Sequence, residues 1–227
     1  MTLQKAVDIL LILQDKYGSP DVSETEAVDL LNMATYEWLN LLLPDSQGGI
    51  VNVEYDSNTL ELVKPLLWNF SVAYGSLSSG YFTTATLSAA LQAASGDAAA
   101  AVFRTLDIAY VDSNSDEWQV RFLKNGARTR FQRNFLKKPA IPKRLYWQPF
   151  GNGVRLQPTT GYTAGSFSFS VIKTPKILAL TGPTVNPELG DYEMYTIIAK
   201  ALRLAGVATR DEEILTDIRN SAIQIAQ

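Results

Sequence analysis

Cysteine and histidine are both missing from the 227 residues of this chain. Without cysteine no disulfide framework can form, and nothing in the composition points to an oxidising compartment. The two absences together exclude Ser-His-Asp and Cys-His triads and a zinc site made of the usual nitrogen and sulfur ligands. Acid–base catalysis would fall to carboxylates, lysine or tyrosine. We therefore expect a protein that is not an enzyme and that uses no metal or cofactor.

Long apolar runs are also missing. No stretch of the sequence is apolar for long enough to span a bilayer, so no membrane association is expected. Polar residues interrupt the apolar positions at the N-terminus, which is typical of an amphipathic helix and not of a signal peptide. A hydrophobic content of 46% with 19% charged residues indicates a folded globular protein with a sizeable core.

Acidic residues are absent from one long segment. Between Trp118 and Pro187, 70 residues contain no Asp or Glu but 12 Lys and Arg. Residues 1–117 carry 16 acids and 4 bases, and residues 188–227 carry 7 acids and 4 bases, so the net charge of −3 conceals a strong polarisation. Charge of this kind governs association and not fold. It predicts that the basic segment meets nucleic acid, another protein or the acidic part of an identical neighbour.

Helical periodicity marks both ends of the chain. Apolar spacing predicts a helix over residues 2–17, and Ser23 with Glu26 forms the pattern of a capping box for a second helix that runs to about Leu43. The short link between them favours an antiparallel helical hairpin. Two more helices are predicted near the C-terminus, over about 187–205 and 210–226.

The middle of the chain alternates as β-strands do. Strands are predicted over 104–111 and 118–123, and an antiparallel meander over 144–149, 154–158 and 166–172. Residues 70–74 and 80–84 are predicted to form a hairpin, residues 86–94 a helix, and residues 125–137 a basic helix that stops before Pro139. These elements predict an α+β fold. A helical bundle domain of residues 1–49 and 187–227 would hold an inserted antiparallel β-rich domain, meander-like or sandwich-like, of residues 50–186.

Two sets of charged residues are candidates for an interaction site. The basic set, which would face a neighbouring subunit or DNA, is Arg121, Lys124, Arg128, Arg130, Arg133, Lys137, Lys138, Lys143 and Arg144. The acidic set on the second helix is Glu24, Glu26, Asp29 and Glu37. In a ring with a heterologous interface, the acidic set of one copy would contact the basic segment of the next. A salt-sensitive contact with nucleic-acid phosphates and a merely solvated basic face are the other interpretations.

Aromatic and acidic clusters have two interpretations each. The aromatic residues among the bases could stack on single-stranded nucleic acid or pack in the β core, and the core is the favoured interpretation for Trp118, Phe135, Trp147 and Phe150. The acids of residues 112–117 and 211–217 could bind a cation through oxygen ligands. An exposed turn and a helix N-terminus explain them more simply.

Short motifs occur along the chain in a recognisable order. They are Asn32–Leu39, Leu62–Leu67, Lys137–Pro142, Tyr146–Pro149, Val154–Pro158, Phe167–Pro175 and Glu188–Ile198. With them the chain resembles the head-to-tail connector proteins, also called ring or adaptor proteins, of tailed bacteriophages, particularly the structural ring proteins of crAss-like podoviruses.

This resemblance implies a structural protein of the virion, made in the host cytoplasm, that forms a ring, usually of twelve copies, between portal and tail. The ring would be a conduit for the genome. The implied partners are identical subunits, the portal protein and other connector or tail rings, with non-specific contact to packaged double-stranded DNA. The alternative from another class is a soluble nucleic-acid-binding module that uses the basic segment of residues 118–187.

Overall fold

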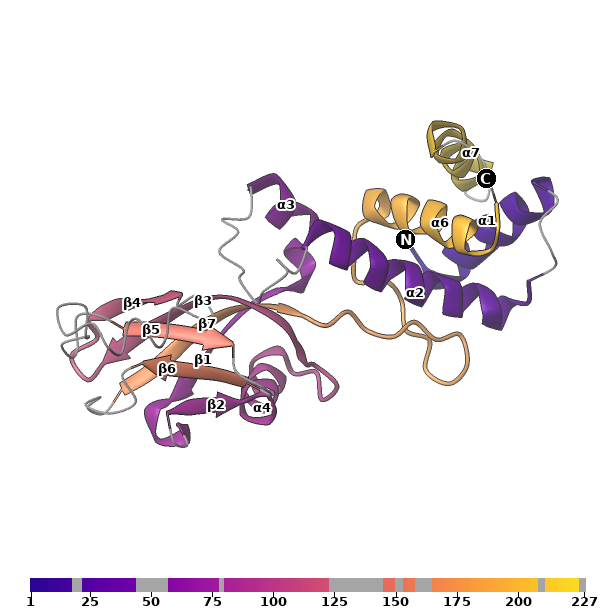
Figure 1. Cartoon of the computed structure of the whole chain (residues 1–227). Helices are drawn as coiled ribbons and strands as arrows, with labels where there is room; N and C mark the ends of the chain where they lie inside the picture. Colours follow the sequence, from indigo (N-terminus) through magenta and orange to yellow (C-terminus); the bar gives the residue numbers. More distant parts are fainter. Residues whose placement is uncertain are drawn as a thin grey trace. The chain divides into compact units, whose positions relative to one another are not determined.

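The computed structural model has a mixed α+β fold (Figure 1). It describes residues 1–17, 22–43, 57–77, 80–122, 145–149, 153–157, 165–207 and 211–224. These residues form six α-helices and a curled, mixed sheet of seven strands. Contacts divide the chain into two compact units. The first comprises Met1–Pro44, Ser57–Pro65 and Pro175–Gln227, and the second comprises Asp45–Asp56 and Leu66–Thr174.

Four helices of the first unit pack against one another. They are α1 (Leu3–Lys16), α2 (Glu24–Leu42), α6 (Asp191–Leu204) and α7 (Asp211–Gln224). Helix α1 contacts the other three, and α6 contacts α2 and α7. All four were predicted from the sequence. The capping box is confirmed because Ser23 Oγ accepts from the Glu26 N–H while Glu26 accepts from the Ser23 N–H. Helix α6 begins at Asp191, after Gly190, which occupies the N-cap position in an extended conformation.

A polar contact joins α1 to α7. Lys16 Nζ lies 2.6 Å from Asp217 Oδ2, and the Tyr17 hydroxyl donates a hydrogen bond to the same carboxylate. Hydrogen bonds from Lys16 and then from Tyr17 hold the pKa of Asp217 below its usual value. These groups therefore connect the end of the first helix with the middle of the last one.

The connection before α6 belongs to the helical unit, although the predicted boundary placed residues 175–186 in the β-rich region. The Leu3 N–H donates to Asn186 Oδ1 at 2.9 Å, and the Lys176 N–H donates to Glu188 at 3.0 Å. The short helix α3 (Ser57–Leu62) also groups with this unit, and the turn η1 (Lys64–Leu66) follows it. Contacts between residues distant in sequence place these segments in the helical unit, and the composition of the segments does not indicate such contacts.

The sheet of the second unit has the order β1-β7-β3-β4-β5-β6-β2. Its strands are β1 (Leu67–Ala73), β2 (Tyr81–Thr83), β3 (Val102–Asp112), β4 (Glu117–Phe122), β5 (Leu145–Pro149), β6 (Gly153–Gln157) and β7 (Gly165–Lys173). Neighbours are antiparallel except β4 and β5, which run parallel. The prediction of a purely antiparallel sheet was therefore wrong.

Two predicted strand pairings were also wrong. Strands β5 and β6 pair as the meander requires, but β7 pairs with β1 and β3 and not with β6. The predicted hairpin of 70–74 with 80–84 does not form, because β1 and β2 stand at opposite ends of the strand order and the turn η2 (Tyr74–Ser76) follows β1. Alternation shows which side chains share a face, but it does not select the partner strand.

Aromatic side chains hold the curled sheet together. Phe82 on β2 makes edge-to-face contacts with Phe167 and Phe169 of β7, with ring centroids 5.4 and 5.5 Å apart. Phe169 also stacks on Phe70 of β1 at 5.5 Å. Side chains from both ends of the strand order therefore meet at β7. Each aromatic pair stabilises the fold by about 1 kcal/mol beyond the contribution of the apolar area that it buries.

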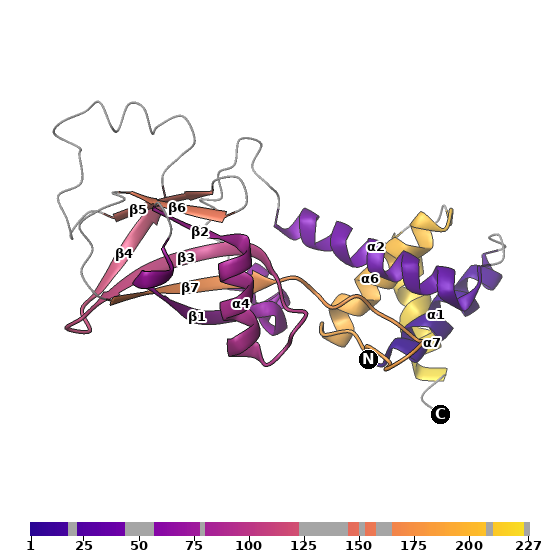
Figure 2. The ribbon, with the colours of Figure 1, turned by 90° about the horizontal axis from the view of Figure 1, so that it is seen from below.

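Helix α4 (Thr84–Ser95) packs against β1, β2, β3 and β6 (Figure 2). It begins where Thr83 Oγ1 accepts a hydrogen bond from the Thr86 N–H, and it ends at Gly96, whose φ of 68° favours glycine. Its buried residues Leu87 and Leu91 join the aromatic core. This helix was predicted from the sequence.

Two of the tryptophans discussed above lie in or against this core. Trp147 is buried and meets Phe122 edge to face at 4.9 Å, while the partly buried Trp118 packs against the same cluster. The core interpretation is therefore confirmed for these two residues. Phe135 and Phe150 lie outside the described residues.

Candidate interaction surface on helix α2

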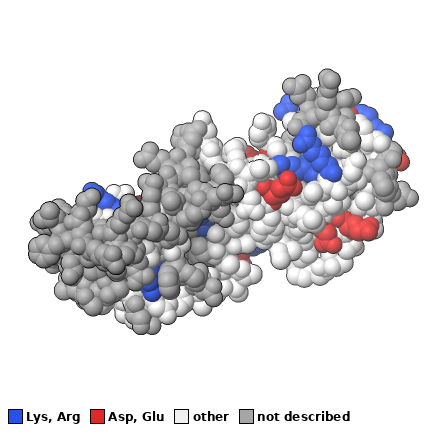
Figure 3. Space-filling model, viewed as in Figure 1, with Lys and Arg blue, Asp and Glu red and all other residues white. Residues whose placement is uncertain are grey.

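The acidic candidates lie on the exposed side of α2. This helix contains no Lys or Arg, and Glu24, Glu26, Asp29 and Glu37 are all exposed. Glu26, Asp29, Met33 and Glu37 are spaced by three, four and four residues, which places them along one stripe of a helix with 3.6 residues per turn. Figure 3 shows red carboxylate surface over α2, in the orientation of Figure 1, with blue Lys and Arg side chains close to it.

A shallow groove of about 300 Å³ lies in this stripe. Its lining combines apolar residues with two carboxylates, and it consists of Val22, Glu26, Asp29, Leu30, Met33 and Ala205. Met33 is 59% exposed, which is unusual for a flexible and polarisable side chain that fills cores well. Ala205 caps the C-terminus of α6. Met33 and Ala205 were not among the predicted site residues, because no local pattern predicts that the end of α6 lies beside α2.

The carboxylate of Glu26 is held in place at one edge of the groove. It accepts hydrogen bonds from the backbone N–H and from Oγ of Ser23, both at 2.8 Å. The backbone hydrogen bond first, and the side-chain one second, lower the pKa of Glu26 below its usual value. The groove therefore carries a fixed negative charge at neutral and at mildly acidic pH.

Of the basic candidates, only Arg121 lies within the described residues. It is exposed on β4, next to the buried Val120, and is the register partner of Tyr146 on β5. The predicted basic helix over 125–137 lies outside the described residues. So do the remaining basic candidates, which are Lys124, Arg128, Arg130, Arg133, Lys137, Lys138, Lys143 and Arg144.

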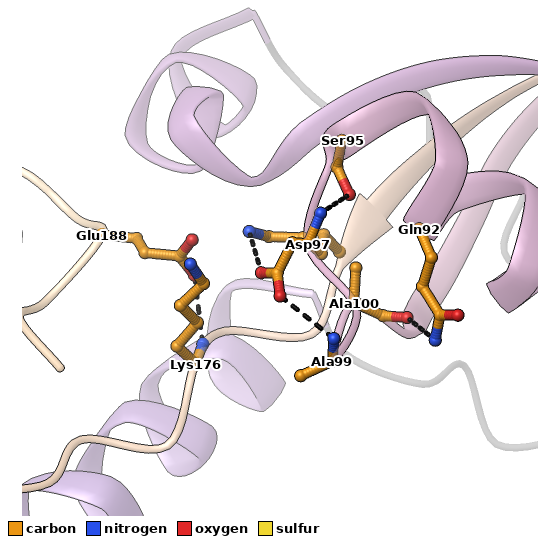
Figure 4. Close-up of polar contacts among 8 residues, drawn as sticks. Gln92, Ser95, Asp97, Ala99, Ala100, Lys176 and Glu188 are labelled. Carbon is orange, nitrogen blue, oxygen red and sulfur yellow. Dashed lines mark hydrogen bonds and ion pairs between the residues drawn. The ribbon is translucent and has the colours of Figure 1, made fainter. Parts of the chain in front are cut away.

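One lysine of the acid-free segment has an internal role. Lys173 is only 4% exposed, and its Nζ lies 3.7 Å from Asp97 Oδ2. Asp97 is held by its own turn, since its N–H donates to Ser95 Oγ at 3.3 Å and its Oδ1 accepts from the Ala99 N–H at 3.1 Å (Figure 4). The segment therefore contains at least one base that is used for folding.

Asn32 fixes a second strip of chain beside α2. Its Oδ1 accepts from the Leu178 N–H at 2.8 Å, and its Nδ2 donates to the Leu178 carbonyl at 3.2 Å. The preceding residue, Ile177, is 68% exposed. The predicted boundaries placed Leu178 in the β-rich domain and assigned it to no helix or strand. The one available signal was an asparagine within a helix, where that residue is disfavoured unless it has a partner.

Replacing Asn32 by aspartate should destabilise the helical unit by about 2 kcal/mol. A carboxylate can accept from the Leu178 N–H, but it cannot donate to the Leu178 carbonyl and places negative charge against it. Urea unfolding measures the effect. Asn40→Asp on the same helix is the control, because Asn40 is exposed and should change stability by less than about 0.5 kcal/mol. If both variants lost the same free energy of unfolding, the pair of hydrogen bonds between Asn32 and Leu178, here called the Asn32 clamp, would not stabilise the helical unit.

The acidic turn at Asp112 gives no further site, and the side chains of Asp211, Glu212 and Glu213 lie outside the described part of the chain. The Asp112 carboxylate accepts from the N–H groups of Asn114 and Asp116, at 2.8 and 3.0 Å, as in an exposed turn. Within the part of the chain that the structure describes, no cluster of three or more acidic, His or Cys side chains could hold a metal ion. No described helix combines the length and the apolar character needed to cross a membrane.

Comparisons with known proteins add no assignment. No protein-family model matches the chain, and no curated protein matches its sequence.

Proposed function

We propose that this chain is a structural protein of a tailed phage virion that assembles as a ring in the head-to-tail connector, between portal and tail. The resemblance of its ordered motifs to connector proteins motivates the proposal. The observation that carries it is the segregation of charge. The exposed side of α2, a helix without any Lys or Arg, presents four carboxylates, and the same chain contains 70 residues without any Asp or Glu.

The separation of acidic from basic residues would help subunits to close into a ring. A ring requires a heterologous contact, in which two different surfaces of each copy meet. An acidic surface that meets a basic one favours the head-to-tail orientation, and it penalises the pairing of two acidic or two basic surfaces. The acidic surface would be that of α2. The basic one would come from the segment that includes Arg121 and the other basic candidates.

The finer architecture belongs to the same proposal. Helices α1, α2, α6 and α7, from both ends of the chain, would form the helical bundle that packs against neighbouring copies, with the β-rich part inserted between them. The absence of His and Cys from the sequence supports a structural role and not a catalytic one. Contacts to passing double-stranded DNA would be made to phosphates, without reading of the base sequence.

Native mass measurement and negative-stain electron microscopy test the proposal. The purified, nuclease-treated chain, alone or mixed with the portal protein of the same phage, is expected to form a closed oligomer of about twelve copies. A chain that stays monomeric in both conditions, and that binds a short DNA duplex with an affinity that falls steeply with salt, would instead be a nucleic-acid-binding module.

A further inference from the structure

Acidic residues and exposed apolar side chains lie together beside Met33, on the described surface of the helical unit. The groove beside Met33 is lined by four apolar residues, Val22, Leu30, Met33 and Ala205, and by two carboxylate residues, Glu26 and Asp29. Leu204, the residue before Ala205, is 41% exposed. A ligand for this groove must therefore combine apolar side chains with positive charge.

One stretch of this chain meets both requirements. Residues 124–138, with the sequence KNGARTRFQRNFLKK, contain six bases and no acid, together with two phenylalanines and a leucine. We propose that the groove on α2 binds this basic segment of a second copy of the chain. The inference rests on the proposed self-assembly and names the surface and the segment that would make the contact.

The two parts of the groove would contribute differently. Exposed ion pairs in water are weak individually and are screened by salt, so the carboxylate of Asp29 in the groove, and that of Glu37 farther along the same stripe of α2, would mainly guide and orient the incoming segment. Removal of Met33 from water would supply affinity that does not depend on salt. A charge change and an apolar change should therefore have distinguishable effects on association.

The charge contribution is tested with a groove variant of the full chain, Asp29→Lys with Glu37→Lys. This variant leaves the capping residue Glu26 in place. Sedimentation velocity should show self-association about tenfold weaker than that of the wild-type chain at about 0.05 M NaCl, with a smaller difference at about 0.5 M. The matched control, Asp15→Lys with Glu61→Lys, reverses two exposed acids on α1 and α3 and should associate like the wild type.

A complementary variant tests the pairing directly. Arg128→Glu, Arg130→Glu and Arg133→Glu make the segment acidic and should also weaken association about tenfold. An equimolar mixture of this variant with the groove variant should recover association. In the mixture a basic groove can accept an acidic segment, and an acidic groove can accept a basic one.

The apolar contribution is tested with Met33→Gln. Because Met33 is 59% exposed, this variant keeps the fold, and it should weaken association about fivefold at both salt concentrations. This measurement does not depend on whether the triple Arg→Glu variant folds.

The outcomes separate this inference from the proposed function. A closed ring that forms equally well from the wild-type chain, the groove variant and Met33→Gln would overturn the docking site and leave the ring in place. Folded charge variants that fail to recover association when mixed would overturn the pairing. A wild-type chain that stays monomeric at every concentration, also with the portal protein, would overturn both.

Discussion

Replacing Phe169 by alanine should destabilise the β-sheet unit by about 4 kcal/mol. Phe169 is fully buried on β7, where it stacks on Phe70 of β1 and meets Phe82 of β2 edge to face. The substitution removes the ring that both ends of the strand order contact. The cost therefore includes the lost burial of an aromatic side chain, two ring contacts and the cavity that remains.

Urea unfolding of the full chain measures this loss, and Ser168→Ala is the matched control. Ser168 neighbours Phe169 on the same strand, is half-buried and points to the other face of the sheet. Its replacement should change stability by less than about 0.5 kcal/mol. If Phe169→Ala cost no more than Ser168→Ala, the aromatic cluster would not be the core that closes the sheet.

Replacing Asp97 by asparagine should destabilise the same unit by about 3 kcal/mol. The asparagine retains the oxygen that accepts from the Ala99 N–H, so the turn after α4 is preserved. The ammonium group of the buried Lys173 loses its charged partner, which is much more costly than losing an exposed ion pair. The melting temperature should fall by about 10 °C for a unit of this size.

A second substitution distinguishes the charge from the turn. In the double variant Asp97→Asn with Lys173→Met, both charges are gone, and an unbranched apolar chain lies near Trp68 in place of the lysine. Most of the lost stability should return. The ion pair would not stabilise the fold if the single variant Asp97→Asn had the same melting temperature as the wild type. The same conclusion would follow if the double variant were as unstable as the single one.

The residues chosen to test stability and those chosen to test association lie in different units of this chain. Phe169, Asp97 and Lys173 lie within the β-sheet unit, whereas Asp29, Met33 and Glu37 are exposed on a helix of the other unit. Exposed substitutions usually change folding stability little. Changes to the α2 groove can therefore be tested for association without unfolding the protein.

Local patterns predicted the helices well and the sheet only in part. Apolar spacing predicts which side a helix buries, and helices were predicted where α1, α2, α4, α6 and α7 lie; a capping box marks the start of α2 alone among the described helices. The strands themselves were also predicted, since alternation separates Phe167 and Phe169 from the serines between them. The pairing of β7 with β1 and β3 depends on contacts between residues far apart in the chain, which no local pattern encodes.

The candidate site on α2 also has features that the sequence could predict and features that it could not. The acidic residues of α2 and their exposure could be predicted, because charged side chains on an amphipathic helix lie opposite its apolar stripe. The groove could not, because it requires the end of α6 beside Leu30 and Met33. The Asn32 clamp on Leu178 could not be predicted either, since it joins two residues separated by most of the chain.

The sequence by itself determined the charge polarity, the absence of His and Cys chemistry and the positions of the main helices, because each depends only on composition or on neighbouring residues. Tertiary structure alone decided the strand order, the burial of Lys173 against Asp97 and the groove in which Ala205 lines the same hollow as the carboxylates of α2. These features arise where distant segments compete to bury the same apolar surface, and packing of the whole chain selects the result.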